Sequence, residues 1–287
     1  MKKIEIPKKS GGKRTIYVQG PNEKRKFRLL GYKMASFFNK NGENIAHGFV
    51  EGRSPVSNAI CHLNKKYTLS FDLKDFFDTV TPEHLKRAGV SEELAGQVCY
   101  EGSTKQGLSS SPSAANVAAI PLDKSIIQSF PPENDIIYTR YADDMCFSSD
   151  NINILLELRK KIPELTQNAG FKINEKKTRI QTSKFGRRII TGIAVDDKIY
   201  PLKKQRKKLR AIKHQLTKLY SFATIINITK QFLLFAVILE INRKKISQYI
   251  GLKEWCKLKT PTESLGGKLY TTMVSENTKK AFSKFQT

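Results

Sequence analysis

The stretch IIYTRYADDMCFSS, residues 136–149, has two arms rich in β-branched and aromatic residues on either side of a tight turn at Tyr141-Ala142-Asp143-Asp144. This pattern predicts a β-hairpin with two adjacent carboxylates near its tip. Neighbouring carboxylates repel each other, so a pair of acids on a turn is usually a solvated feature without chemistry. A second β-prone run changes that interpretation.

Residues 67–71, YTLSF, form this second run, which ends at a third carboxylate, Asp72. A carboxylate from one strand and one or two from a neighbouring hairpin can hold two divalent cations about 3.5–4 Å apart. Such a pair activates an attacking hydroxyl and stabilises the leaving oxygen of an in-line phosphoryl displacement. The three acids therefore predict nucleotidyl transfer, which is the chemistry of a polymerase.

The segments around these strands alternate between strand and helix patterns. Four of them are a hairpin over residues 3–18 and helices over residues 55–66, 113–129 and 152–169. The hairpin turns at Gly11-Gly12, and Pro131-Pro132 ends the third segment. This order predicts an α+β fold in which an antiparallel sheet carries helices on one face.

Charge is distributed unevenly along the chain. With 287 residues, 39% of them hydrophobic, the chain can form one large domain or two ordinary ones, and its net charge of +25 favours a polyanionic partner. Residues 1–30 carry ten cations and two anions, and residues 198–287 carry twenty and four, whereas residues 31–197 are nearly neutral. Basic flanks around a carboxylate-rich centre indicate chemistry at the centre and nucleic-acid binding at the ends.

The spacing of the cysteines and the length of the apolar runs predict an intracellular protein. The four cysteines lie at least 38 residues apart, which predicts neither a zinc site nor a disulfide framework. The longest apolar run, Phe232 to Leu239, is too short to span a bilayer. We expect a reduced, cytoplasmic protein that does not enter a membrane.

Residues 198–287 predict a small helical domain. Leucine and isoleucine residues between Leu202 and Leu219 form one apolar stripe, and eight cations without an acid fill residues 203–218. An ordinary solvated face is one explanation. Contact with duplex phosphates is the better one, because eight cations in sixteen residues exceed what solubility requires.

Six ordered motifs resemble those of reverse transcriptases. They are GGKR at 11–14, SFDLKDFF at 70–77, KQGLSSSPSAAN at 105–116, YADD at 141–144, GFKINEKKT at 170–178 and ITG at 190–192. Residues 58–62, NAICH, fit the NAxxH signature of retron reverse transcriptases. The resemblance implies a right-hand polymerase fold, with fingers and palm over residues 1–197 and a basic helical thumb over residues 198–287.

The resemblance also implies roles for the three acids. Asp72 and Asp143 would be the principal ligands of two Mg²⁺ ions, with Mn²⁺ as a substitute. Asp144 would be an additional carboxylate, and the carbonyl of Leu73 a further ligand.

Nucleotide binding is implied for five side chains, namely Lys13, Arg14, Phe77, Gln106 and Lys177. The two finger cations would hold the triphosphate, and Phe77 would pack beneath the sugar and exclude a 2′-hydroxyl. Core packing is the alternative for Phe76 and Phe77, and at least one of them is expected there. Thr104-Lys105 replaces the usual Leu-Pro before Gln106. Lys177 would protonate pyrophosphate, in competition with Lys172, Lys176 and Arg179.

The retron signatures and the basic helix are assigned to RNA. This set comprises Asn58, His62, Thr191, Gly192, Lys203, Lys204, Arg206, Lys207 and Arg210. For Asn58 and His62, one helical turn apart, a structural role that satisfies buried backbone groups is an equal alternative.

The resemblance implies an RNA-directed DNA polymerase of a retron. It would copy a cognate structured non-coding RNA with deoxynucleoside triphosphates, from the 2′-hydroxyl of a guanosine, into a branched RNA–DNA product, msDNA. It further implies bacterial antiphage defence with a separate effector protein, and higher-order assembly is compatible with it. The alternatives are a group II intron-like or other bacterial reverse transcriptase, or a catalytically silent RNA-binding scaffold.

Overall fold

The computed structural model describes residues 1–7, 11–130, 135–208, 210–212 and 214, and the chain divides into two compact units. The first unit comprises Met1–Val50 and Lys65–Thr191, and the second comprises Glu51–Asn64 and Gly192–Thr287. The predicted helix pattern beyond residue 214 lies outside the described residues. The assignment of fingers and palm to residues 1–197, and of a thumb to the remainder, stays a prediction.

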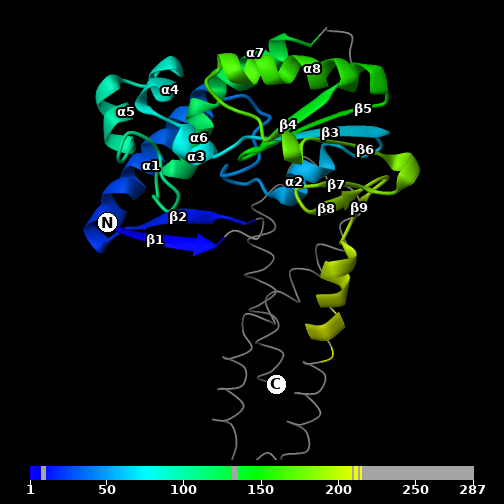
Figure 1. Ribbon diagram of the computed structural model, residues 1–287, viewed down its shortest axis with the longest axis horizontal. Helices are drawn as coiled ribbons and strands as arrows, with labels where there is room; N and C mark the ends of the chain where they lie inside the picture. Colours follow the sequence, from blue (N-terminus) through cyan, green and yellow to red (C-terminus); the bar gives the residue numbers. More distant parts are fainter. Residues whose placement is uncertain (8–10, 131–134, 209, 213, 215–287) are drawn as a thin grey trace, which may run out of the picture. The chain divides into compact units, whose positions relative to one another are not determined.

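A four-stranded antiparallel sheet is the centre of the first unit. Its strands are β4 (Ile137–Tyr141), β5 (Asp144–Ser149), β3 (Tyr67–Asp72) and β6 (Arg179–Thr182), in that order across the sheet. Helices α7 (Ile120–Gln128) and α8 (Ile152–Asn168) cover one of its faces (Figure 1). The α+β fold predicted from the sequence is confirmed.

The other elements of this unit are mostly short helices around the sheet. They are α1 (Pro21–Asn41), α3 (Phe76–Thr79), α4 (Pro82–Arg87), α5 (Glu92–Val98), α6 (Ser111–Ala118), the 3-10 turns η1 (Glu175–Lys177) and η2 (Ser183–Phe185), and strand β7 (Arg188–Ile190). The helix predicted over 113–129 is two helices, α6 and α7. The break falls before Pro121, whose missing N–H suits the first turn of a new helix.

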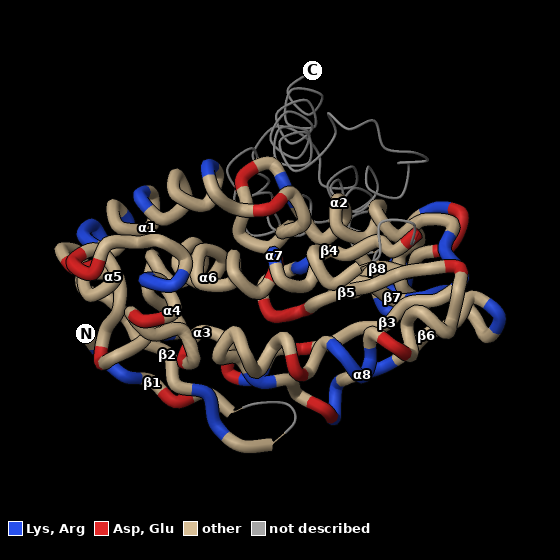
Figure 2. Tube along the Cα trace, turned by 90° about the horizontal axis from the view of Figure 1, so that it is seen from above, with Lys and Arg blue, Asp and Glu red and all other residues tan. Residues whose placement is uncertain are grey.

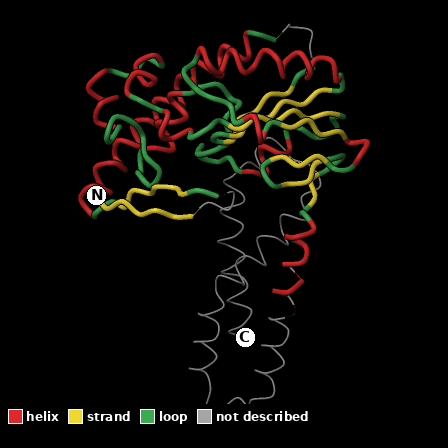
Figure 3. Tube along the Cα trace, in the orientation of Figure 1, coloured by secondary structure: helices red, strands yellow, loops and turns green. Residues whose placement is uncertain are grey.

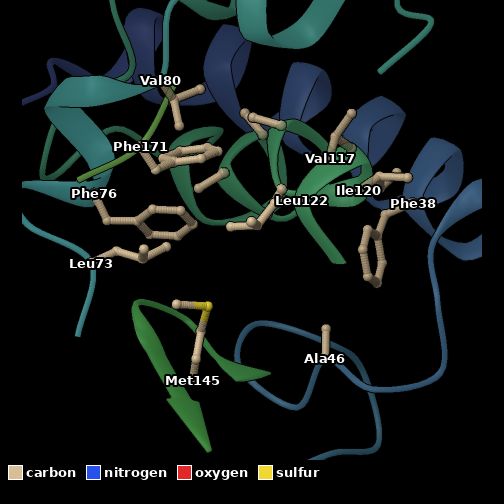
Figure 4. Close-up of a cluster of buried hydrophobic side chains, with 14 of the residues drawn as sticks. Phe38, Ala46, Leu73, Phe76, Val80, Val117, Ile120, Leu122, Met145 and Phe171 are labelled. Atoms are coloured by element: carbon tan, nitrogen blue, oxygen red, sulfur yellow. The ribbon is translucent and has the colours of Figure 1, made fainter. Parts of the chain in front are cut away.

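The hydrophobic core lies beneath the carboxylate-bearing ends of the strands. Leu73, Phe76 and Phe171 pack above Met145 of β5, and helices α6 and α7 contribute side chains such as Val117 and Leu122 (Figure 4). These side chains are all at most 4% exposed. The residues that follow Asp72 are therefore anchored in the core, which fixes the end of β3.

The predicted N-terminal hairpin is present as β1 (Lys2–Pro7) and β2 (Lys13–Val18), a separate two-stranded sheet (Figure 3). Gly11 and Gly12 have φ angles of 86° and 79°, which only glycine adopts at low cost. Lysine and arginine residues recur along this hairpin and along α1 (Figure 2).

The second unit contains α2 (Pro55–Ile60), β8 (Ile193–Val195) and β9 (Ile199–Tyr200), and residues 203–208 are helical. Helix α2 is shorter than the predicted 55–66. It ends at Ile60, and the chain turns so that the Asn64 N–H donates to the carbonyl of Asp196 at 2.9 Å. Within the described residues, no helix is both long and apolar enough to cross a membrane.

Candidate active site

Strand register brings the three predicted acids together. In the β3–β5 pair, Asp72 stands directly opposite Asp144. Asp143 occupies the turn between β4 and β5, after Ala142 with φ 57°, a left-handed conformation typical of two-residue hairpin turns. The Leu73 N–H donates to the carbonyl of Asp143 at 2.9 Å, which fastens the turn to the end of β3. Carboxylates 71 residues apart in the sequence thus share one edge of the sheet.

The surroundings of Asp143 and Asp144 disfavour the charged forms of these two acids. Asp72 is 7% exposed and Asp144 is open to solvent. Desolvation by the surrounding protein, followed by repulsion from Asp143 and Asp72, raises the pKa of Asp144 to about 6. Desolvation and repulsion from Asp72 also raise the pKa of Asp143. A cation that binds between these carboxylates reduces their mutual repulsion.

Lys177 supplies such a cation from within the protein. Its Nζ donates to Asp72 Oδ2 at 2.7 Å, and this hydrogen bond raises the pKa of Lys177. Asn174 Nδ2 donates to Asp72 Oδ1 at 3.3 Å, and the Asn174 N–H donates to the Asp72 carbonyl at 2.8 Å. Sequence reasoning did not assign Asn174 a role, although it lies within the GFKINEKKT motif. Of the four cations that the sequence left in competition, Lys177 is the one placed on Asp72.

A buried polar network lies behind the turn and was also missed. Arg140, wholly buried in β4, pairs with the buried Asp123 of α7 and donates from Nη1 to the carbonyl of Ala142 at 3.2 Å. Nη1 also donates to Asn116 Oδ1 at 2.9 Å. The sequence offered only a weak signal for this pair, namely an acid within residues 120–128 and an arginine within residues 137–141.

Residues 45–48 run beside β4 and close the back of the turn. The His47 N–H donates to the Arg140 carbonyl at 2.7 Å, and the Arg140 N–H donates to the Ile45 carbonyl at 3.0 Å. A Cβ on Gly48 would lie 2.4 Å from the backbone nitrogen of Ala142. Only glycine fits there, so the contact between this segment and the turn is backbone to backbone.

The three carboxylates are suitable ligands for a hard divalent cation, although their side chains do not form a closed coordination site. Among the described residues, no group of three or more His, Cys, Asp or Glu side chains is close enough to hold a metal ion. Carboxylate oxygens at an exposed edge are nonetheless the ligands that Mg²⁺ prefers, with water completing its shell. Asp72, Asp143 and Asp144 therefore fit a divalent cation by the chemistry of their oxygen donors, and their assignment as metal ligands stays a prediction.

Comparison with known proteins supports the same chemistry. The sequence profile of the family described as reverse transcriptase (RNA-dependent DNA polymerase) matches residues 6–249. The Retron Ec73 reverse transcriptase of Escherichia coli is 31% identical over 223 residues, covering 68% of this chain and 68% of that protein. The chain belongs to the retron-type reverse transcriptases. The Retron Mx65 enzyme of Myxococcus xanthus is 29% identical over 243 residues, 73% of this chain but 54% of that protein. The chain thus spans only about half the length of that relative.

Solved structures agree on the fold. A telomerase from Candida albicans, in complex with a fragment of telomeric RNA, superposes with a TM-score of 0.56 at 11% identity, over 96% of this chain and 62% of that one. An apo telomerase from Candida tropicalis gives 0.54 at 14% identity, over 88% and 56%. The shared fold is the polymerase fold expected from the motifs.

The two predicted finger cations of this retron-type chain differ in their surroundings. Lys13 Nζ lies 2.6 Å from Glu5 Oε2 across the hairpin, and both side chains are exposed. The positive charge of Arg14 partly offsets the rise in the pKa of Asp143, of which desolvation is the largest cause. Arg14 is therefore the finger cation with an electrostatic link to the carboxylates.

Phe77 and Gln106 lie on segments that are held by hydrogen bonds to neighbouring parts of the chain. Phe76 is 4% exposed and belongs to the core, whereas Phe77 is half-buried and packs against that core. Thr104, which replaces the usual Leu, donates from Oγ1 to the Phe77 carbonyl at 2.5 Å. The Gln106 carbonyl accepts from the Tyr17 N–H at 2.8 Å, which ties the QG turn to β2.

The residues predicted to bind RNA occupy two kinds of environment. Asn58 and His62 are at most 1% exposed, and Asn58 Oδ1 has no partner among the described atoms.

Thr191 and Gly192 form a turn with φ angles of 46° and 77°. The five predicted cations of the basic helix are exposed, and Ile212 on its apolar stripe is buried. These RNA assignments stay predictions.

Proposed function

We propose that this chain is the RNA-directed DNA polymerase of a retron and performs two-metal nucleotidyl transfer at Asp72, Asp143 and Asp144. The observation that carries the proposal is the register of β3 and β5, which sets Asp72 opposite Asp144 beside the Asp143 turn. Family membership supports the reaction class.

Each group of the site then has a chemical task. Two divalent cations, Mg²⁺ or Mn²⁺, supply activation of the attacking hydroxyl and charge stabilisation on the leaving oxygen. Asp72 and Asp143 hold them, with Asp144 and the Leu73 carbonyl as further oxygen donors. Lys177 would donate a proton to the departing pyrophosphate, and its hydrogen bond to Asp72 at 2.7 Å supports this role. Arg14 holds the triphosphate from the hairpin.

The finer parts of the proposal are those implied by the resemblance of the sequence motifs to retron reverse transcriptases. The template is a cognate structured non-coding RNA, the substrates are deoxynucleoside triphosphates, and priming from a guanosine 2′-hydroxyl yields branched msDNA. A cytoplasmic role in antiphage defence, with a separate effector protein and higher-order assembly, completes it. Asn58, His62, Thr191, Gly192 and the basic helix are proposed to hold the RNA.

A primer-extension assay tests the core of this proposal. Purified protein with Mg²⁺, a DNA primer annealed to RNA and all four deoxynucleotides should give extension, and Asp143→Asn should abolish it. The matched control is Glu164→Gln, an exposed acid on the outer side of α8, which should extend like the parent. RNA binding by Asp143→Asn should persist, because the basic residues are unchanged. Robust extension by Asp143→Asn would refute the metal assignment, and no extension by the parent would favour an RNA-binding scaffold.

A further inference from the structure

Phe49 is an exposed aromatic residue in an unfavourable backbone conformation. Its φ angle is 61° and its side chain is 46% exposed. Left-handed backbone is disfavoured for an ordinary L residue, because Cβ comes too close to the carbonyl oxygen that follows it. Asparagine or glycine adopts it more readily, and strain of this kind concentrates at functional sites. The presence of phenylalanine at this position is therefore explained by the contacts of its aromatic ring.

That ring lies against Phe77. The two ring centroids are 5.9 Å apart with an interplanar angle of 47°, within the range of favourable aromatic contact. On another side, Phe77 contacts the core ring of Phe76 at 6.0 Å. The Phe77 backbone is held by the Thr104 hydroxyl at 2.5 Å. The half-buried Phe77 ring thus contacts both the core and Phe49.

Phe49 is itself fixed to the catalytic turn. The residue before it, Gly48, packs its backbone against Ala142, and the Gly48 carbonyl accepts from Asn116 Nδ2 at 2.8 Å. Asn116 in turn accepts from Arg140, which also holds the Ala142 carbonyl. One short segment therefore contacts both the carboxylate-bearing turn and the ring expected beneath the sugar.

We propose that Phe49 is a positioning residue for sugar selection: it supports the Phe77 ring at a fixed place relative to the carboxylates, so that a ribonucleoside triphosphate is rejected. The inference rests on the proposed function, which places Phe77 beneath the sugar of the incoming nucleotide. Discrimination by a steric gate depends on how little the gate moves, because a ring that can shift opens space beside the 2′ carbon. Removing the support should therefore relax sugar choice while leaving the catalytic carboxylates in place.

The test compares kcat/KM for dATP and ATP on an RNA template with a DNA primer. Phe49→Asn and Phe49→Gly remove the ring and suit the left-handed backbone, and Phe49→Tyr keeps the ring. We expect the first two to lower the dATP preference about tenfold, chiefly through improved use of ATP, and the third to retain it. Phe185→Asn, which changes an 88% exposed phenylalanine, should leave the preference unchanged.

Phe77→Val separates failure of the inference from failure of its premise. If Phe77→Val lowers the dATP preference but Phe49→Asn and Phe49→Gly do not, Phe49 does not position the gate and the inference is overturned, while the proposed function stands. If Phe77→Val has no effect in a folded, active enzyme, the sugar gate lies elsewhere and the inference falls with that assignment. Combined Phe49→Gly/Phe77→Val should be no less selective than Phe77→Val alone, because a missing ring needs no support, and an additive loss would contradict the coupling. Should Phe49→Gly fail to fold, Phe49→Asn and the Phe49→Tyr comparison still decide the question.

Discussion

Arg140 and Asp123 form a wholly buried ion pair directly behind the Ala142-Asp143 turn. Arg140 Nη2 lies 2.7 Å from Asp123 Oδ2, and Nε lies 3.0 Å from Oδ1. The Tyr138 hydroxyl donates to the same carboxylate at 2.8 Å. The remaining nitrogen, Nη1, reaches the carbonyl of Ala142, the residue before Asp143. The carboxylate of Asp123 balances the charge of Arg140. Arg140 can therefore hold the turn without adding an uncompensated charge beside the carboxylates that are proposed to bind metal.

We expect Arg140→Met to lower the free energy of unfolding by about 3–5 kcal/mol, because it leaves the buried Asp123 carboxylate without its cationic partner. The double variant Arg140→Met/Asp123→Leu should be more stable than Arg140→Met, since it removes the orphaned charge as well. Urea unfolding followed by circular dichroism measures both. Lys86→Met, which breaks an exposed pair with Glu92, is the control and should be nearly neutral. A double variant less stable than Arg140→Met would contradict this account.

The raised pKa of Asp144 predicts how stability depends on pH when no divalent metal is present. Its folded value of about 6 lies above the ordinary 3.8, so the folded state binds the proton more tightly than the unfolded state. This carboxyl therefore favours folding at low pH, and that contribution is lost as pH rises through about 6. Asp144→Asn, which stays neutral, should raise the melting temperature in EDTA at pH 8, with a gain that shrinks between pH 6 and pH 4. A gain independent of pH would show that the cost of holding Asp144 in its charged form, through desolvation first and repulsion second, is not the cause.

Lys177 should matter more than its neighbour in the sequence. Replacing Lys177 by Met is expected to lower kcat for extension about 10²-fold with a small change in KM, because it removes a proton donor at the carboxylates. Lys176→Met is the comparison, because Lys176 is exposed and makes no ion pair within the described part of the chain. Pre-steady-state incorporation of one nucleotide gives both constants. Equal losses in the two variants would mean that the contact with Asp72 does not select the functional lysine.

Template choice is expected to reside in the C-terminal part of the chain. Residues 198–287 carry twenty cations against four anions, whereas residues 31–197 are nearly neutral. Exchange of residues 186–287 for the equivalent segment of a related retron enzyme should transfer use of that enzyme's RNA. Extension of a generic primer on RNA should persist in the chimera. If the chimera copies only the original RNA, recognition lies in the N-terminal hairpin or around Asn58 and His62.

The sequence by itself determined the features that depend on neighbouring residues. The alternation in 67–71 and 136–149 predicted the two elements that carry the carboxylates, and Gly11-Gly12 predicted the N-terminal hairpin. These are short-range properties, because a strand pattern has a period of two residues and a tight turn needs particular residues at its corner. The ordered motifs then indicated the family. Helix ends were less predictable, as α2 and the division between α6 and α7 show, since they depend on single capping and proline positions.

Only the tertiary structure decided which side chains meet. Lys177 lies 105 positions from Asp72 and was one of four candidate cations, and neither Asn174 nor Phe49 carried a recognisable signal. The Arg140–Asp123 pair joins a strand to a helix, and Gly48 fits against Ala142 only because two backbones approach there. Contacts of this kind follow from strand register and from helix packing over the whole domain. Residue type and local spacing state what a side chain can do, whereas its partner is fixed by the packing of segments that are distant in the chain.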